Sequence, residues 1–241
     1  MSAMIQQTVV SFADGVGHYI KAMARLELSL KQVGFKGKGK MINDYGHINS
    51  PHHKGSPDAV PYAFKALSIK KAIEEQNNTG LLLWCDSVVY ATKDIQPVFD
   101  HIKEHGYLFF DNLGFSVGDY TSDACLQKWG MERHIAFETK MLMACVLGFD
   151  LDNPVTQQFL KLYIDAALDG VSYHGSWTNE NLQVSNDMRV KGHRHDQSVA
   201  SIIVKQLGLK VTHAQSTFFA YAQHKGILPI SDNICLWSEG I

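Results

Sequence analysis

Along the first 110 positions, short apolar runs alternate with amphipathic stretches. The run 8–12 (TVVSF) is rich in β-branched and aromatic residues and predicts a strand, and apolar residues at helical spacing follow over 18–33. A further short strand is expected at 41–43. A helix then opens at Pro61, and its apolar stripe consists of Tyr62, Ala66, Ile69 and Ile73.

A second set of runs continues this alternation. The run 81–84 (LLLW) is apolar throughout and is bounded by Gly80 and Asp86, which is typical of a strand buried on both faces. A helix is expected over 94–105, with Asp94 as its cap, and a strand over 107–110. This order predicts an α/β fold with a mostly parallel central sheet, flanked by helices, that binds ligands at the carboxyl ends of its strands.

The second half of the chain is more helical. Elements expected there are helices at 138–147, at 154–168 and from about Asp196 to Leu207, and a short strand at 210–212. The segment 46–61 is rich in Gly, Pro, Ser and His and predicts a long surface loop, a kind of segment that is often functional. Since no repeat and no Pro-rich or Ser-rich linker divides the chain, one domain is expected over 1–241.

Composition and charge exclude several classes of protein. The 241 residues are 45% hydrophobic and 19% charged, as expected of a folded globular chain. Lys and Arg number 22 against 24 Asp and Glu, so the net charge of -2 offers no basic excess for nucleic acid. No apolar stretch approaches the roughly 18 residues of a membrane span, and no secretory signal pattern opens the sequence. We therefore expect a cytoplasmic protein. The sequence does not indicate its oligomeric state. The cysteines show no C-x-x-C pair, which favours reduced thiols at Cys85, Cys125, Cys145 and Cys235.

Two segments concentrate side chains that can do chemistry. Asp86 directly follows a predicted buried strand, where a carboxylate can bind a metal, hold ribose hydroxyls or simply cap a turn. The segment 192–198 (GHRHDQS) places histidines, an arginine, an aspartate and a glutamine at the start of a predicted helix. Such groups bind anions or metals and transfer protons, although Asp196 could also be a plain N-cap. Lys65, on the first turn of its helix, could reach a phosphate or remain solvated.

Several well-known motifs are missing. The sequence contains no P-loop signature and no G-x-G-x-x-G after its first strand, which disfavours P-loop NTPases and Rossmann dehydrogenases. It also lacks the G-x-S-x-G elbow of serine hydrolases and the H-E-x-x-H motif of zinc proteases.

Six segments in order carry a resemblance to a known family: SFADG, ARLELSL, PYAFKALSIKKAIEE, LLLWCDSVVY, HGYLFFDNLG and GHRHDQSVASII. Over residues 8–212 the chain resembles a nucleotide-sugar-dependent glycosyltransferase of the GT-A fold, of the small single-domain type seen in bacteria and large DNA viruses. The resemblance implies a Rossmann-like α/β domain over 1–241, with a nucleotide-sugar-binding half at 1–115 and an acceptor-side half at 116–241.

The resemblance also implies a donor site. Asp14 and Lys65 would contact the nucleotide of a UDP- or GDP-linked sugar, and Asp86 would occupy the first position of a D-x-D motif, with Ser87 beside it. Val88 stands at the third position, so the second carboxylate is missing. Mn²⁺ or Mg²⁺ could still bind through Asp86, diphosphate oxygens and His195. Alternatively, Lys65 or Arg194 neutralises the leaving diphosphate.

The remaining implied roles concern the sugar and its acceptor. Asp196 would be the catalytic carboxylate on the acceptor side, either as the general base of an inverting enzyme or as the residue that orients the acceptor or donor sugar in a retaining one. His195 would be the reserve base, and the acceptor would be a glycan or another hydroxyl compound. Further substrate contacts are expected from Asp111, Asn112, His193 and Gln197. Trp129 or Trp177 could offer an aromatic platform to an acceptor ring, or pack in the core.

Two other functions remain open from the sequence. One is a catalytically silent sugar- or nucleotide-binding module, which the loss of the second D-x-D carboxylate keeps open. The other is a nucleotidyltransferase, which would normally carry a Gly-rich signature after its first strand, where this chain has Ala13-Asp14-Gly15.

Overall fold

The computed structural model describes residues 5–14, 17–43, 60–214, 216–226 and 230–239. A central sheet of five strands has the order β2-β1-β3-β6-β5. Its strands are β1 (Gln7–Phe12), β2 (Lys38–Ile42), β3 (Leu81–Cys85), β5 (Tyr107–Ser116) and β6 (Lys140–Asp150). Strands β2, β1 and β3 pair in parallel, whereas β6 is antiparallel to both of its neighbours. Four of the five strands therefore share one direction, which confirms the mostly parallel sheet expected from the sequence.

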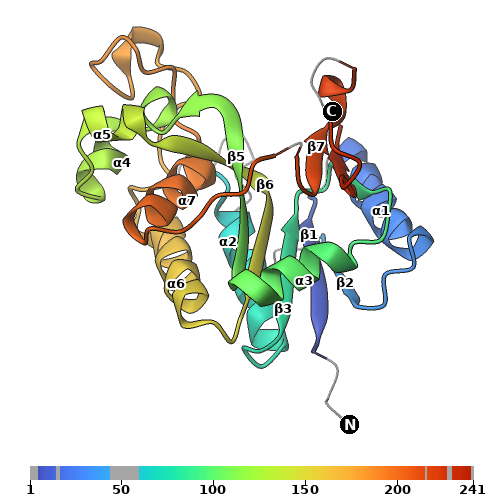
Figure 1. Cartoon of the computed structure of the whole chain (residues 1–241). Helices are drawn as coiled ribbons and strands as arrows, with labels where there is room; N and C mark the ends of the chain where they lie inside the picture. Colours follow the sequence, from blue (N-terminus) through green and yellow to red (C-terminus); the bar gives the residue numbers. More distant parts are fainter. Residues whose placement is uncertain (1–4, 15–16, 44–59, 215, 227–229, 240–241) are drawn as a thin grey trace.

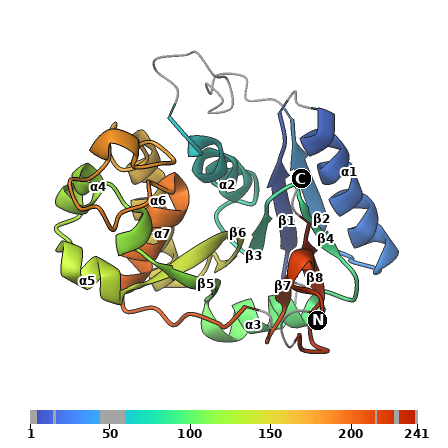
Figure 2. The same cartoon turned by 90° about the horizontal axis from the view of Figure 1, so that it is seen from above.

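Helices cover both faces of this sheet (Figures 1 and 2). One face carries α2 (Ala63–Glu75), α6 (Pro154–Leu168) and α7 (His195–Gln206), and the other carries α1 (Gly17–Gln32) and α3 (Gln96–His105). A smaller sheet of β4 (Val89–Ala91), β8 (Leu236–Ser238) and β7 (Phe219–Tyr221) lies on the α1 side. The remaining short elements are α4 (Asp123–Lys128), α5 (Arg133–Glu138) and the 3₁₀ turns η1 (Gly118–Tyr120), η2 (Glu180–Leu182) and η3 (Ala222–His224).

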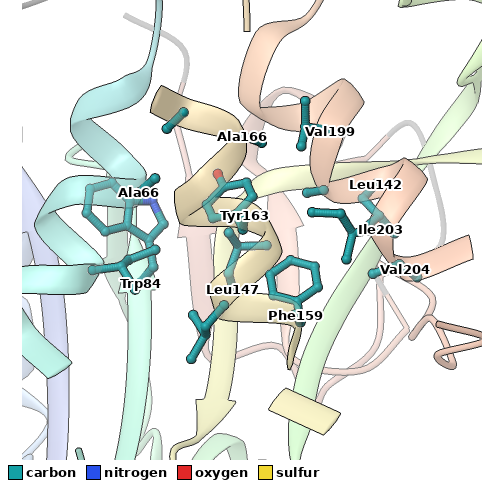
Figure 3. Close-up of a cluster of buried hydrophobic side chains, with 14 of the residues drawn as sticks. Ala66, Trp84, Leu142, Leu147, Phe159, Tyr163, Ala166, Val199, Ile203 and Val204 are labelled. Carbon is teal, nitrogen blue, oxygen red and sulfur yellow. The ribbon is translucent and has the colours of Figure 1, made fainter. Parts of the chain in front are cut away.

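The period of two along each strand divides the core into two layers. On β3, Leu82 and Trp84 face α2, α6 and α7, whereas Leu81 and Leu83 face α1 and α3. All four side chains are almost completely buried. Figure 3 shows the first layer, in which Tyr163 of α6 lies between Trp84 and the apolar face of α7. The continuous apolar run of β3 is thus explained by cover on both faces.

One predicted element is wrong. Residues 138–147, expected as a helix, belong mainly to strand β6, which pairs with β3 on one side and with β5 on the other. Because β6 comes from the second half of the chain and lies between two strands of the first, the two predicted halves share one sheet. The strand expected at 210–212 is reduced to a single bridge between Thr212 and Phe110.

Other boundaries follow local rules. Helix α6 starts at Pro154, and the Asn153 side chain accepts hydrogen bonds from two backbone N–H groups of its first turn. Helix α3 ends at Gly106, whose φ of 88° is the left-handed conformation of a helix C-terminus. Most of the predicted loop 46–61 lies outside the described residues. No helix in the described ranges combines the length and the apolar character that crossing a membrane requires.

Candidate functional site

Three residues far apart in sequence meet where α2, the end of β3 and the start of α7 come together. Lys65, on the first turn of α2, is 1% exposed, and its Nζ lies 2.7 Å from Asp196 Oδ2 and 3.1 Å from Asp86 Oδ1. The same ammonium donates to the backbone oxygen of Ala144 at 2.8 Å. Its three protons are thus all used, so the geometry gives no support to a direct contact between Lys65 and a nucleotide. We call Asp86, Lys65 and Asp196 the ionic triad.

Each member is placed by the end of an element. Asp86 follows β3, and its backbone N–H donates to Cys145 O, which prolongs the pairing with β6. Its Oδ1 also accepts a 2.7 Å hydrogen bond from Trp84 Nε1. Asp196 lies on the first turn of α7, where the helix dipole favours a carboxylate. Sheet and helices therefore fix the triad more rigidly than a loop would.

Burial and charge act against each other in the triad. Burial alone would lower the pKa of Lys65, but the two carboxylates outweigh it and raise that pKa, so the lysine is charged. Burial raises the pKa of Asp196, and Asp86 adds to this effect, whereas Lys65 opposes it. Asp196 is therefore a carboxylate with an increased affinity for protons, as suits a base.

A pocket of about 320 Å³ opens beside the triad, at the carboxyl ends of β1 and β3. Of the ionic triad, Asp86 lines it directly, with 31% of its side chain exposed. The complete lining is Phe12, Ala13, Asp14, Tyr19, Tyr62, Phe64, Asp86, Ser87, Val88, Tyr221, Gln223, Ser238 and Glu239. The predicted donor residues Asp14, Asp86 and Ser87 therefore lie on one pocket.

The last part of the chain closes one wall of this pocket, which the sequence did not reveal. Glu239 pairs with Arg25 of α1, and Arg25 also donates to the backbone oxygen of Val88 at 3.0 Å. The guanidinium of Arg25 lies 4.4 Å from the ring centre of Tyr90. The turn that follows Asp86 is thus held by residues from both ends of the chain. No short motif marks these contacts, because they depend on the pairing of β4 with β8.

His195 and Tyr62 are an unusual pair beside the triad. Both have positive φ, 44° and 61°, which costs energy for residues with a Cβ. Their rings stack with centroids 5.4 Å apart and planes 14° apart. His195 Nδ1 lies 2.9 Å from Tyr173 O and so carries the proton, which leaves a lone pair on Nε2. That atom is covered and has no hydrogen-bond partner among the described residues. Burial lowers the pKa of His195 to about 4, so the ring is neutral.

Two neighbours in the same segment have internal partners. His193 is fully buried, its Nδ1 accepts from Ser122 N at 3.2 Å, and its Nε2 lies 3.0 Å from Ser172 O. Burial lowers its pKa to about 3. Gln197 Nε2 donates to Leu142 O at 2.6 Å. Both ring nitrogens of His193 and the side-chain amide of Gln197 thus hydrogen-bond backbone groups, which stabilises the segment around the site. The geometry gives no support to the predicted contacts of His193 and Gln197 with a substrate.

The remaining predicted residues lie elsewhere. Asp111 is 5% exposed and accepts a hydrogen bond from Ala214 N at 3.0 Å. Neither Asp111 nor its half-buried neighbour Asn112 is among the described residues that line the pocket. Arg194 is also outside that lining, and its guanidinium lies between two aromatic rings. Of the two tryptophans, Trp177 is 44% exposed, whereas Trp129 Nε1 bonds the buried Ser172 hydroxyl at 2.9 Å.

The described side chains do not fit a resident metal ion. Asp86 Oδ1 is already shared by Lys65 and Trp84, and Ser87 and Val88 add no carboxylate. An ammonium 3.1 Å from Asp86 also repels a cation. Within the described ranges, no three His, Cys, Asp or Glu side chains are grouped so that they could hold a metal ion. The predicted ligand pair Asp86 and His195 therefore gains no support from the geometry.

Sheet order, helix layers and pocket position define an α/β fold of the GT-A type. A solved glycosyltransferase involved in the glycosylation of the major capsid of PBCV-1 shares it, with a TM-score of 0.52 and 13% identity over 97% of this chain and 92% of its own. The galactosyltransferase LgtC, in complex with donor and acceptor sugar analogs, has a TM-score of 0.49 and 11% identity over 96% of this chain and 86% of its own. The sequence matches no protein-family model and no curated protein. The likeness is thus one of fold.

Proposed function

We propose that this protein transfers a sugar from a nucleoside diphosphate, UDP or GDP, to a hydroxyl group of a glycan or another acceptor. The observation that carries the proposal is the ionic triad beside a pocket at the carboxyl ends of β1 and β3, where open α/β sheets bind their ligands. The fold supports it, because a solved protein that shares it is a glycosyltransferase.

The pocket suits the parts of such a donor. Asp14 and Asp86 offer carboxylate oxygens, which accept hydrogen bonds from ribose or sugar hydroxyls. Tyr19, Phe64 and Tyr62 offer aromatic surface to a base or a sugar ring. The donor half of the proposal therefore rests on residues that the structure brings together.

The acceptor side is assigned to Asp196. Transfer requires that the acceptor hydroxyl be oriented and, in an inverting reaction, deprotonated. Asp196 has the raised pKa of a better base, and Lys65 fixes its Oδ2 at 2.7 Å. Lys65 is a positioning residue in this scheme, since it reaches the substrate only through the two carboxylates.

The charge of the triad bears on the donor. Two carboxylates and one ammonium leave one negative charge, which disfavours a diphosphate unless a cation accompanies it. Mn²⁺ or Mg²⁺ would in this proposal arrive with the donor, held by its diphosphate oxygens and water and not by the described side chains. A comparison of binding with and without Mn²⁺ tests it.

The test separates donor binding from transfer. We expect calorimetry to detect UDP, GDP or one of their sugars. Asp86→Asn should weaken that binding about tenfold or more, because a carboxylate that faces the pocket is a stronger acceptor for the ribose or sugar hydroxyls of the donor than an amide. Asp196→Asn should lower transfer about 100-fold or more, the usual scale for a general base, and should change donor affinity by less than about threefold.

Asp165→Asn is the matched control, because this exposed carboxylate on α6 pairs only with Lys161 in the described structure. It should change neither quantity. Full activity in both site variants would contradict the assignment, and donor binding without any transfer would favour the silent binding module.

A further inference from the structure

Arg194 differs from the other arginines of the chain. Arg25, Arg133 and Arg189 each pair with a carboxylate: Glu239, Asp123 and Asp187, respectively. The half-buried side chain of Arg194 has no carboxylate and no hydrogen-bond acceptor among the described residues. Its guanidinium instead lies 4.5 Å from the ring centre of Tyr120 and 4.4 Å from that of Trp177. A guanidinium held between two rings retains donors for a ligand.

Trp177 connects Arg194 with the pocket wall. Trp177 meets Tyr62, a residue of the pocket wall, with ring centroids 5.5 Å apart at 65°. Trp177 also meets His195 at 5.1 Å and exposes 44% of its surface. Two aromatic rings, those of Trp177 and Tyr62, thus separate Arg194 from the pocket, and Arg194 lies two residues before Asp196. It precedes the first turn of α7, where the helix dipole also favours an anion.

The arrangement is built before any ligand arrives. Two backbone hydrogen bonds, Asn179 N to Lys191 O at 2.9 Å and His193 N to Ser176 O at 2.7 Å, hold the loop of Trp177 against Arg194. Gly192 permits this approach, because a Cβ there would lie 1.9 Å from Trp177 O. A preformed clamp of this kind avoids the entropy cost of ordering side chains during binding.

We infer that Arg194, with Trp177, binds an anionic group, a carboxylate or a phosphate, on the acceptor sugar. The guanidinium binds the anion by two parallel N–H bonds, and the exposed part of Trp177 contacts the apolar face of the sugar ring. This inference rests on the proposed function, and it names the substrate class of the acceptor side as acidic sugars. Lys191 is not part of the subsite, because it pairs with Asp119 at 3.2 Å.

Matched acceptors test the inference. Transfer to p-nitrophenyl glucuronide and to glucose 6-phosphate is compared with transfer to p-nitrophenyl glucoside. At least one acidic acceptor should have a kcat/KM about tenfold or more above that of the neutral glucoside, a factor typical of one charge-assisted contact. The glucuronide and the phosphate ester show which anion the subsite prefers.

Arg194→Met keeps the length of the side chain between the rings and removes its charge. It should raise KM for the acidic acceptor about tenfold, with little change in kcat, and leave the neutral acceptor unaffected. Arg194→Lys should recover only part of the preference, since an ammonium cannot form the two parallel bonds. Melting temperatures confirm that the variants fold.

Three outcomes would overturn the inference: equal use of acidic and neutral acceptors, an equal loss with both in Arg194→Met, or weaker donor binding in that variant, which would place the guanidinium on the diphosphate. If neither donor binding nor transfer is found, the proposed function itself fails. Calorimetry of glucuronate and glucose 6-phosphate against glucose, with wild type and Arg194→Met, then decides the inference alone.

Discussion

At the scale of single residues, the most informative feature is a lysine that cannot reach solvent. Lys65 is neutralised by Asp86 and Asp196 and bonded to a backbone oxygen, so every proton of its ammonium has an acceptor. A buried charge of this kind is tolerated only when it is fully paired. The same lysine holds the two carboxylates close together, which without it would repel each other.

Lys65→Met tests this dependence. Methionine fills a similar volume, but it leaves the buried Asp196 and the partly exposed Asp86 without their cation. We expect the free energy of unfolding to fall by about 3–5 kcal/mol, the usual cost of breaking a buried ion pair on one side. Urea denaturation measures it. Lys70→Met, in an exposed pair with Glu74 on the same helix, should cost less than about 0.5 kcal/mol. Equal small losses in both variants would contradict the role of the triad.

The sequence identified all three triad members but not their relation. Asp86 is marked by its position after an apolar run, Asp196 by the polar cluster GHRHDQS at a helix start, and Lys65 by its position on the first turn of a helix. Their contact depends on how α2, β3 and α7 pack, which local spacing does not encode. The stacking of Tyr62 on His195 was missed for a further reason: positive φ at a tyrosine or a histidine contradicts local preference and arises from tertiary structure.

At the scale of elements, the fold was predictable where apolar runs were bounded by Gly, Pro or Asp. Helix α6 and strand β3 are examples. The prediction failed for β6 because its run, KMLMACVLGFD, has no period of two and contains Leu, Met and Ala, which favour helices. A strand between β3 and β5 with cover on both faces needs no alternation. Here tertiary context decided the element, not local propensity.

The loop 175–178 is an element whose position depends on one glycine. Gly192→Ala would place a Cβ 1.9 Å from Trp177 O, and the contact is with backbone, so the loop itself must move. We expect a loss of about 1–3 kcal/mol in the free energy of unfolding, as is typical when a packed contact is overfilled. Gly17→Ala is the control, because a Cβ added there, at the start of α1, would meet nothing within 4 Å. Urea denaturation compares them, and equal stability of the two variants would show that the loop adapts freely.

At the scale of the whole molecule, the pocket is assembled from both ends of the chain. The β1 end and the turn after β3 form its base, and Tyr221, Gln223, Ser238 and Glu239 close one wall. Strand β8 joins this wall to β4, from which it is separated by more than 140 positions. The pairing of two strands so far apart along the chain leaves no recognisable pattern in a single sequence. This explains why the donor carboxylates could be anticipated, whereas Tyr221, Gln223, Ser238 and Glu239 could not.

The whole fold should also be sensitive to mild acid, through His193 and His195. Burial lowers their pKa values to about 3 and about 4 in the folded chain, from an ordinary 6.5. Between about pH 4 and 6.5 the unfolded chain therefore binds protons at these histidines that the folded chain does not bind. Above pH 6.5 both states leave the histidines neutral, so the free energy of unfolding is not reduced by them. As pH falls from about 6.5 toward 4, the free energy of unfolding should decrease, with a limiting slope of about 1.4 kcal/mol per pH unit for each histidine.

Urea denaturation between pH 7.5 and 4.5 measures this slope. His193→Gln should be less stable at every pH, because it loses the two hydrogen-bonded ring nitrogens. The slope of its free energy of unfolding against pH should be smaller by the contribution of one histidine, about 1.4 kcal/mol per pH unit at the limit. His134→Gln, which changes an exposed histidine, should keep the slope of the wild type. A flat profile from pH 6.5 to 4.5 would show that the two rings take up protons while folded. Because both histidines belong to the segment that carries Arg194 and Asp196, acid should disable the proposed acceptor side together with the fold.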